Sequence, residues 1–82
     1  MFAVLLDGVV YTAVAEVGGR WIDGNSGWDV SEGTLLGTFY KAVYANGRRF
    51  EYYRQGQEVY QLCPDGKLMW FCAWEVADTL LP

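Results

Sequence analysis

Histidine is absent from this chain of 82 residues, and cysteine and proline occur only twice each. Histidine is the commonest general base and metal ligand, so its absence excludes Ser-His-Asp and Cys-His catalytic arrangements. Two cysteines without histidine cannot supply the four ligands of a structural zinc site. We therefore expect no metal ion, no cofactor and no enzymatic activity.

Positive charge is also scarce, with 6 Lys and Arg against 10 Asp and Glu and a net charge of −4. Nucleic-acid binding requires a basic surface, so the balance predicts no direct contact with nucleic acid. Arg48, Arg49 and Arg54 do cluster, but Glu51 interrupts them. We interpret these residues as a solvated and partly paired hairpin surface. An acidic chain is instead suited to a partner with a basic surface.

Long apolar runs are missing, which argues against a membrane-spanning segment. The N-terminal apolar stretch is broken by Asp7-Gly8, and no positive charge precedes it. Cys63 and Cys72 flank a turn, and a two-residue loop would place them about 13 Å apart along the strands, too far for a disulfide. Reduced cysteines indicate a reducing compartment, and we predict a cytoplasmic protein.

What the chain does contain is strand-forming sequence punctuated by glycine. Hydrophobic residues make up 52% and aromatic residues 17%. Tight turns are indicated at four places between apolar stretches, namely Asp7-Gly8, Asn46-Gly47, Gln55-Gly56 and Pro64-Asp65-Gly66. Asp-Gly and Asn-Gly suit two-residue hairpins, because these residues tolerate positive φ. We predict one domain over residues 1–82, mainly β, with a small antiparallel meander forming a barrel or sandwich.

Two hairpins can be assigned in register. The Asp7-Gly8 turn pairs Leu6 with Val9 and gives one apolar face made of Phe2, Val4, Leu6, Val9, Tyr11 and Ala13. A two-residue Asp65-Gly66 loop would pair Cys63 with Leu68. Both faces of this second hairpin are apolar, so one face is covered either by the segment 18–34 or by a partner.

Residues 35–45 carry a mixed signal. Their apolar residues recur at helical spacing, and Ser31 and Asn46-Gly47 could cap a helix at its two ends. The glycines and threonines at 33, 34, 37 and 38, together with Val43 and three aromatics, favour a strand instead. We favour the strand; the alternative is an α+β fold, with a helix at about 31–45 packed on an antiparallel sheet.

The sequence suggests a binding function without naming the partner. No known family is matched by motif. We predict a small acidic, non-catalytic protein-binding module, most concretely an anti-CRISPR-like inhibitor of the kind that phages direct against host defence complexes. Acidic side chains would meet a basic partner surface while tryptophans anchor the contact; the candidate residues are Asp23, Trp28, Asp29, Glu32, Trp70 and Trp74.

Two alternative functions stay open. A homodimeric structural or assembly protein would use the apolar strand 67–74 as its interface. A small-ligand binder would use an aromatic pocket, formed by residues such as Tyr52, Tyr53, Tyr60, Trp70 and Trp74.

Overall fold

The computed structural model describes residues 1–18, 20–24, 29–30 and 33–82. Its strands are β1 (Phe2–Leu6), β2 (Val9–Val17), β3 (Arg20–Asp23), β4 (Asp29–Val30), β5 (Thr34–Ala45), β6 (Arg48–Gln55), β7 (Glu58–Leu62) and β8 (Leu68–Ala73). A 3₁₀ turn, η1 (Trp74–Val76), and one helical turn, α1 (Ala77–Leu80), follow β8. The mainly-β fold predicted from the sequence is therefore confirmed.

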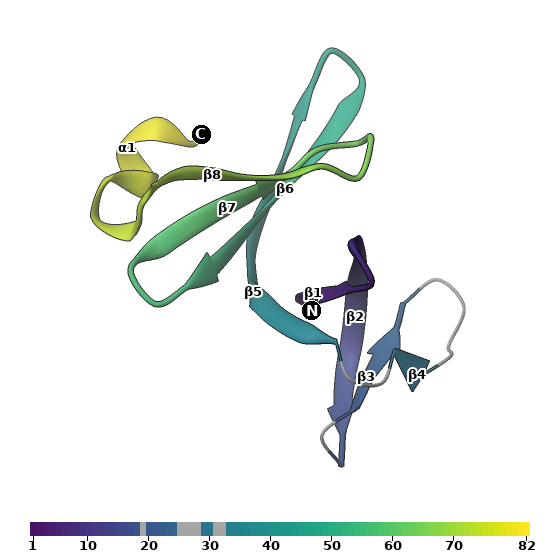
Figure 1. Ribbon diagram of the computed structural model, residues 1–82. Coiled ribbons are helices and arrows are strands. Elements are labelled where there is room, and N and C mark those ends of the chain that lie inside the picture. Colours follow the sequence, from purple (N-terminus) through teal and green to yellow (C-terminus); the bar gives the residue numbers. More distant parts are fainter. Residues whose placement is uncertain (19, 25–28, 31–32) are drawn as a thin grey trace.

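The eight described strands form a single antiparallel sheet in the order β4-β3-β2-β1-β5-β6-β7-β8. Two meanders, β1–β4 and β5–β8, thus join through the pairing of β1 with β5 in the middle of the sheet (Figure 1). Over the described residues the sheet does not close into a barrel. The α+β alternative was wrong, because the segment given to a helix contains the twelve-residue strand β5.

The first two hairpin turns form as their residues dictate. Asp7 and Gly8 have φ of 51° and 77°, and Asn46 and Gly47 have φ of 54° and 75°. Positive φ at both central residues defines the turn that matches the twist of paired strands. The predicted pairing of Leu6 with Val9 is confirmed.

The β7–β8 hairpin differs from its predicted register. Its loop has three residues instead of two, because Gly66 takes the positive φ of 90° and the Cys63 carbonyl accepts the Gly66 N–H at 2.9 Å. Cys63 consequently pairs with Lys67 and not with Leu68. One extra residue in β8, Phe71, then restores the predicted pairing of Val59 with Cys72.

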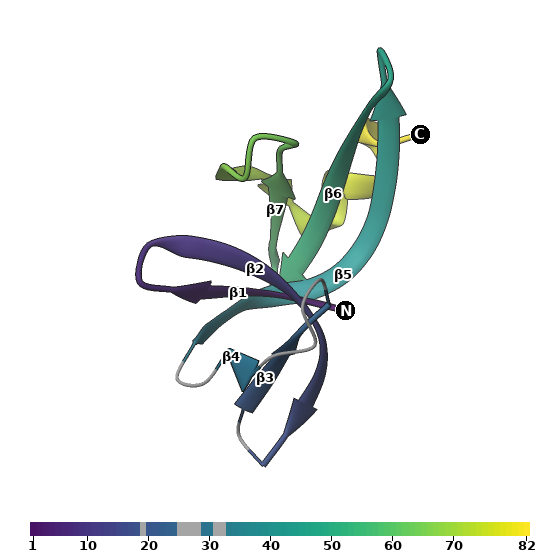
Figure 2. The same cartoon turned by 90° about the vertical axis from the view of Figure 1, so that its right-hand side faces the viewer.

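Similar one-residue bulges recur through the sheet. Four residues have no directly opposite residue on one of the neighbouring strands: Val14 in β2, Leu36 and Tyr40 in β5, and Phe71 in β8. A bulge bends its strand and increases the local twist. Strand β5 carries two of them and curves strongly between the two meanders (Figure 2), which turns one half of the sheet toward the other.

The main hydrophobic cluster lies in the C-terminal half of the chain. Its buried members are Tyr52, Val59, Cys72, Ala77 and Leu81, with five partly buried side chains packed around them, Tyr40, Val43, Phe50, Phe71 and Trp74. Edge-to-face ring pairs contribute to it, with 5.0 Å between the centroids of Tyr52 and Phe71. The C-terminal turns η1 and α1 complete the cluster.

The N-terminal half buries smaller residues. Ala3, Val4 and Ala13 are inaccessible to solvent. Of the predicted apolar face, Val4 and Ala13 are buried as expected, whereas Val9 is 52% exposed. Val9 lies next to the turn, beyond the residues that β3 and β5 pair with. Ala3 points to the other face, so the centre of β1 is covered on both sides.

Two further expectations from the sequence concern the cysteines and membrane-spanning helices. Cys63 and Cys72 are both free thiols, as their spacing predicted. Within the described ranges, no helix has the length and apolar character needed to cross a membrane.

Candidate functional site

The acidic segment proposed from the sequence is only partly visible. Trp28 and Glu32 lie outside the described residues, and so does the side chain of Asp29, whose backbone forms β4. Asp23 ends β3 opposite Ala13 and is only 9% exposed. Its carboxylate therefore presents little charge to a partner, and the acidic patch stays a prediction.

The two tryptophans predicted to share a face are separated. Trp70 lies in β8 and is 59% exposed. Trp74 lies beyond the end of β8, where its ring packs against Tyr40 at 4.8 Å and under the Arg54 guanidinium at 3.9 Å. The bulge at Phe71 and the end of the strand cause this difference. Trp70 is available at the surface, whereas Trp74 is part of the C-terminal cluster.

The predicted aromatic pocket is not assembled either. Tyr52 and Tyr53 are adjacent in β6, so their side chains point to opposite faces of the sheet, and both are buried. Tyr60 pairs with Trp70 on the face of Tyr53. The five aromatics proposed as a platform are therefore divided between the two faces of the sheet, and some of them pack in the C-terminal cluster.

One exposed apolar surface lies at the last strand of the sheet. We call it the β8 edge and define it by Leu68, Met69 and Trp70. Met69 is 54% exposed, and the Trp70 indole N–H donates to the carboxylate of Glu58. Among the described residues no strand pairs with the outer side of β8.

The direction of the backbone groups at the β8 edge follows from the hairpin. The Cys63 N–H donates to the Lys67 carbonyl at 2.8 Å, so this is a hydrogen-bonded pair. Such pairs alternate along an antiparallel ladder. The backbone N–H and C=O groups of Met69 therefore bond to β7, while those of Leu68 and Trp70 point away from β7, to the open side of the strand.

A groove also lies between the β1–β2 hairpin and the β7–β8 turn. We call it the inter-hairpin groove. It consists of two hollows of about 390 and 460 Å³ that share Val10 and Gly66. The first is lined by Val10, Thr12, Arg49, Glu51, Leu62, Cys63, Pro64 and Gly66, and the second by Leu5, Gly8, Val10, Leu36, Asp65, Gly66, Lys67 and Leu68. Hollows of this size can hold small molecules.

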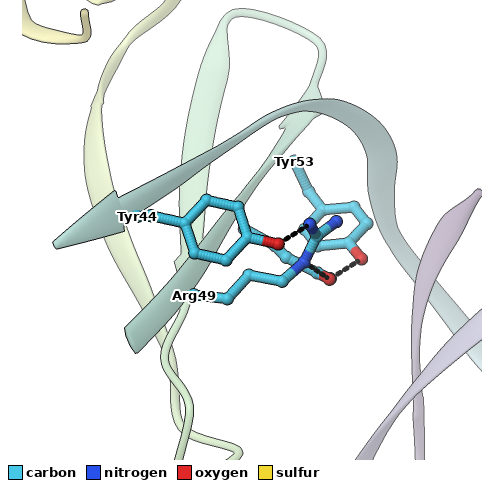
Figure 3. Close-up of polar contacts among 4 residues, drawn as sticks. Tyr44, Arg49 and Tyr53 are labelled. Carbon is cyan, nitrogen blue, oxygen red and sulfur yellow. Dashed lines mark hydrogen bonds and ion pairs between the residues drawn. The ribbon is translucent and has the colours of Figure 1, made fainter. Parts of the chain in front are cut away.

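Arg49 and Glu51, which line the first hollow, form a polar cluster with Tyr44 and Tyr53 (Figure 3). The Arg49 Nε donates to Glu51 Oε2 at 2.9 Å, and Arg49 Nη1 donates to the Tyr44 hydroxyl at 2.9 Å. The other carboxylate oxygen, Glu51 Oε1, accepts the Tyr53 hydroxyl at 2.5 Å. The buried Tyr53 holds the Glu51 carboxylate in place. This carboxylate and the Tyr44 hydroxyl together fix the orientation of the Arg49 guanidinium.

The electrostatics of the cluster follow from burial and from these bonds. Burial raises the pKa of Tyr53 strongly, and the hydrogen bond to Glu51 adds to the effect, so the phenol stays protonated. The bond to Glu51, then the bond to Tyr44, raise the pKa of Arg49, which stays cationic. Outside the cluster, burial raises the pKa of the Cys72 thiol, as expected for an unreactive cysteine.

Sequence reasoning treated residues 48–54 as a partly paired surface, and the Arg49–Glu51 ion pair agrees with that interpretation. It missed that the cluster lines a groove. The available signal was the alternation of Arg49, Glu51 and Tyr53, which places all three on one face of β6. What it could not show is that the bend in β5 brings β1 and β2 over this face.

Comparison with known proteins adds no assignment: no family model, no curated protein and no solved structure matches this chain. Over the part of the chain that is described, no three Cys, Asp or Glu side chains gather as metal ligands would. The β8 edge and the inter-hairpin groove are therefore the surfaces from which a function can be inferred.

Proposed function

We propose that the protein is a non-catalytic protein-binding module whose contact surface is the β8 edge. The observation that carries the proposal is the exposure of Trp70 and Met69, at 59% and 54%, on the outermost strand of the sheet. Tryptophan and methionine are enriched in protein interfaces, and tryptophan is a frequent anchor. A large apolar side chain on an unpaired strand supports binding by strand addition.

The backbone of the β8 edge adds a second contribution. Leu68 and Trp70 direct their N–H and C=O groups outward, so an extended partner segment could bond to both residues. Side chains of the added segment would alternate between the two faces of the sheet. One set would contact Trp70, and the other set would contact Met69.

Charge favours a basic partner. Glu58 contacts Trp70 and is exposed, and Glu75 is exposed just beyond the end of β8. The whole chain carries a net charge of −4. Complementary charge on the partner would speed association and make it sensitive to salt. A basic, extended segment with apolar side chains is therefore the proposed occupant.

Inhibition of a host defence complex by a phage protein stays the most concrete form of this function. Its support is the small, acidic, aromatic-rich composition together with the β8 edge. In that form the module would occupy a basic surface of the complex. Trp70 would replace Trp28 as the apolar anchor, and Glu58 and Glu75 would supply the negative charge.

The test is quantitative affinity capture from nuclease-treated lysate of the host cells, using the wild type and Trp70→Thr. We expect a partner retained by the wild type to be depleted at least about tenfold by this change, the scale of losing a central aromatic anchor. Val17→Thr is the matched control, because Val17 is 62% exposed and lies on β2. It should retain the partner in full.

Trp70→Pro separates backbone pairing from side-chain contact. The Trp70 N–H points outward, so proline removes this donor without breaking a bond to β7. Strand addition predicts that Trp70→Pro binds more weakly than Trp70→Thr. Equal retention of the partner by wild type and Trp70→Thr would exclude the β8 edge.

A second copy of this chain is the competing occupant of the β8 edge, and it corresponds to the homodimer alternative. Light scattering at low micromolar concentration distinguishes the two. A wild type that is dimeric, with a monomeric Trp70→Thr variant, would replace the proposed partner by self-association. A monomeric wild type that captures a basic protein supports the module.

A further inference from the structure

The inter-hairpin groove carries a second inference, and of its lining only Leu68 also belongs to the β8 edge. We propose that it binds an aliphatic carboxylate, with the carboxylate at Arg49 and the hydrocarbon chain along the second hollow. The proposal joins three observations: a positioned guanidinium at one end, aliphatic walls at the other, and a volume suited to a small molecule.

The guanidinium is held in place before any ligand arrives. Two of its nitrogens are engaged, Nε by Glu51 and Nη1 by Tyr44. Among the described residues no partner occupies Nη2. Holding a long side chain in one conformation costs rotamer entropy, which a ligand then does not have to supply. The remaining Nη hydrogens can meet a carboxylate in the two-bond geometry typical of arginine.

Glu51 does not take the place of the ligand. Both of its oxygens already accept hydrogen bonds, one from Tyr53 and one from Arg49. Its carboxylate engages the Nε hydrogen, whereas one Nη1 hydrogen and both Nη2 hydrogens have no partner among the described residues. Glu51 acts as a positioning residue: it orients Arg49 and is itself fixed by the buried Tyr53.

The second hollow is aliphatic where the sequence suggested an aromatic pocket. Leu5, Val10, Leu36 and Leu68 line it. Leu36 is the extra residue of a bulge between β5 and β1, and bulges redirect single side chains beside binding sites. Each methylene of a ligand that leaves water in such a hollow contributes to binding.

A peptide fits these walls less well than a hydrocarbon chain. Every peptide unit carries a donor and an acceptor, and burying them without partners is costly. The four aliphatic side chains of the second hollow offer no such partners. Asp65 and Lys67 lie in its lining as well, and the Asp65 carboxylate already accepts the Lys67 backbone N–H at 3.0 Å.

The experiment is an NMR titration of the full chain with decanoate, below its micellar concentration, and with 1-decanol as the uncharged analogue. We expect decanoate to shift the amide signals around Val10, Leu36, Arg49 and Leu68. Arg49→Gln should weaken decanoate binding by about tenfold or more, the scale of a charge-assisted hydrogen bond, and should leave decanol unchanged.

Arg48→Gln is the matched control. It removes the same charge from the neighbouring residue of β6, which is exposed and does not line the groove. Decanoate binding should be unaffected by it. Leu36→Ala tests the other end, and we expect it to weaken decanoate and decanol alike. The thermal transition of each variant shows that it is folded.

Several results would overturn the proposal. These are equal affinity for decanoate and decanol, equal weakening by Arg49→Gln and Arg48→Gln, or absence of shifts around the groove. Tighter binding of N-acetyl-trileucine than of decanoate would assign the groove to a peptide instead. None of these results depends on partner capture at the β8 edge, so the two proposals fail separately.

Discussion

The two halves of the sheet are built on different principles. Strands β5–β8 with α1 surround an aromatic cluster, in which Tyr52 packs against Phe71 and the Gln61 amide donates to the Tyr52 hydroxyl at 2.8 Å. Strands β1–β3 bury small residues, and Val17 and Val14 stay exposed. Buried apolar area supplies most folding free energy, so the C-terminal half should provide more of the stability.

This difference also separates framework from binding surface. The inter-hairpin groove needs both halves, because Thr12 comes from β2 and Arg49 from β6. The β8 edge belongs to the C-terminal half alone. A change that loosens the N-terminal half should therefore damage the groove before it affects the β8 edge.

The largest effect is expected in the aromatic cluster. Tyr52→Ala should lower the free energy of unfolding by about 3–5 kcal/mol, because it leaves a cavity and removes the partner of Gln61. Val4→Ala, the matched change in the N-terminal half, should cost about 2 kcal/mol for two methyl groups and a small cavity. Urea denaturation measures both. A larger loss for Val4→Ala would reverse the comparison.

The next effect concerns the junction of the halves. A Cβ on Gly37 would lie 2.9 Å from the Arg54 carbonyl oxygen, which is backbone and cannot rotate away. Gly37→Ala should therefore cost about 1–3 kcal/mol. A Cβ on Gly24 would meet the Val14 methyl at 2.9 Å, where this exposed side chain can turn, and would come no closer to backbone than 3.2 Å, at the Thr12 carbonyl oxygen. Gly24→Ala should cost less in the same denaturation experiment.

A smaller effect should appear at alkaline pH. Burial and the bond to Glu51 raise the pKa of Tyr53 above its ordinary value of 10.0. Above about pH 10 the unfolded chain releases this proton and the folded chain keeps it, so stability falls as pH rises. Tyr53→Phe should show a shallower decline between pH 9 and 11.5.

The control for this pH series is Val17→Thr, which changes no titratable group at an exposed position and should keep the wild-type slope. Denaturation midpoints measured at each pH give the slopes. Identical slopes for wild type and Tyr53→Phe would mean that the phenol titrates alike in the folded and unfolded chains.

The smallest effect is expected at the exposed face of β2. Val17 is 62% exposed, so Val17→Thr should change the free energy of unfolding by less than about 0.5 kcal/mol. Thermal or urea unfolding is sufficient to measure it. A loss above 1 kcal/mol, on the scale of a buried methyl, would show that another part of the chain covers this valine.

Local sequence predicted the local features of this fold well. Asp7-Gly8 and Asn46-Gly47 have few alternatives to a hairpin, and both turns form. The strand at β5 prevailed over the helical spacing of its apolar residues, because β1 and β6 supply partners on both sides. Where the helix and strand signals of a segment are this evenly balanced, pairing with neighbouring strands decides which structure forms.

The site was less accessible to sequence reasoning. Exposure of Trp70 depends on where the sheet ends, and the groove depends on bulges at Leu36 and Tyr40. A bulge shifts the register by one residue, and no residue type predicts its position reliably. The β7–β8 loop shows the same limit: its glycine was recognised, but its length was taken as two instead of three.

The bulge in β8 has a consequence for how the chain tolerates changes of length. On either side of Phe71 the ladder is complete, with Tyr60 opposite Trp70 and Val59 opposite Cys72. Deleting Phe71 would join these two stretches and leave every remaining side chain on its present face. Deleting Met69 instead would bring Trp70 opposite Gln61 and move its side chain to the other face of the sheet. Within β8, Phe71 is therefore the position whose deletion keeps the pairing of its neighbours, although the packing of its ring on Tyr52 and the rest of the hydrophobic cluster is lost.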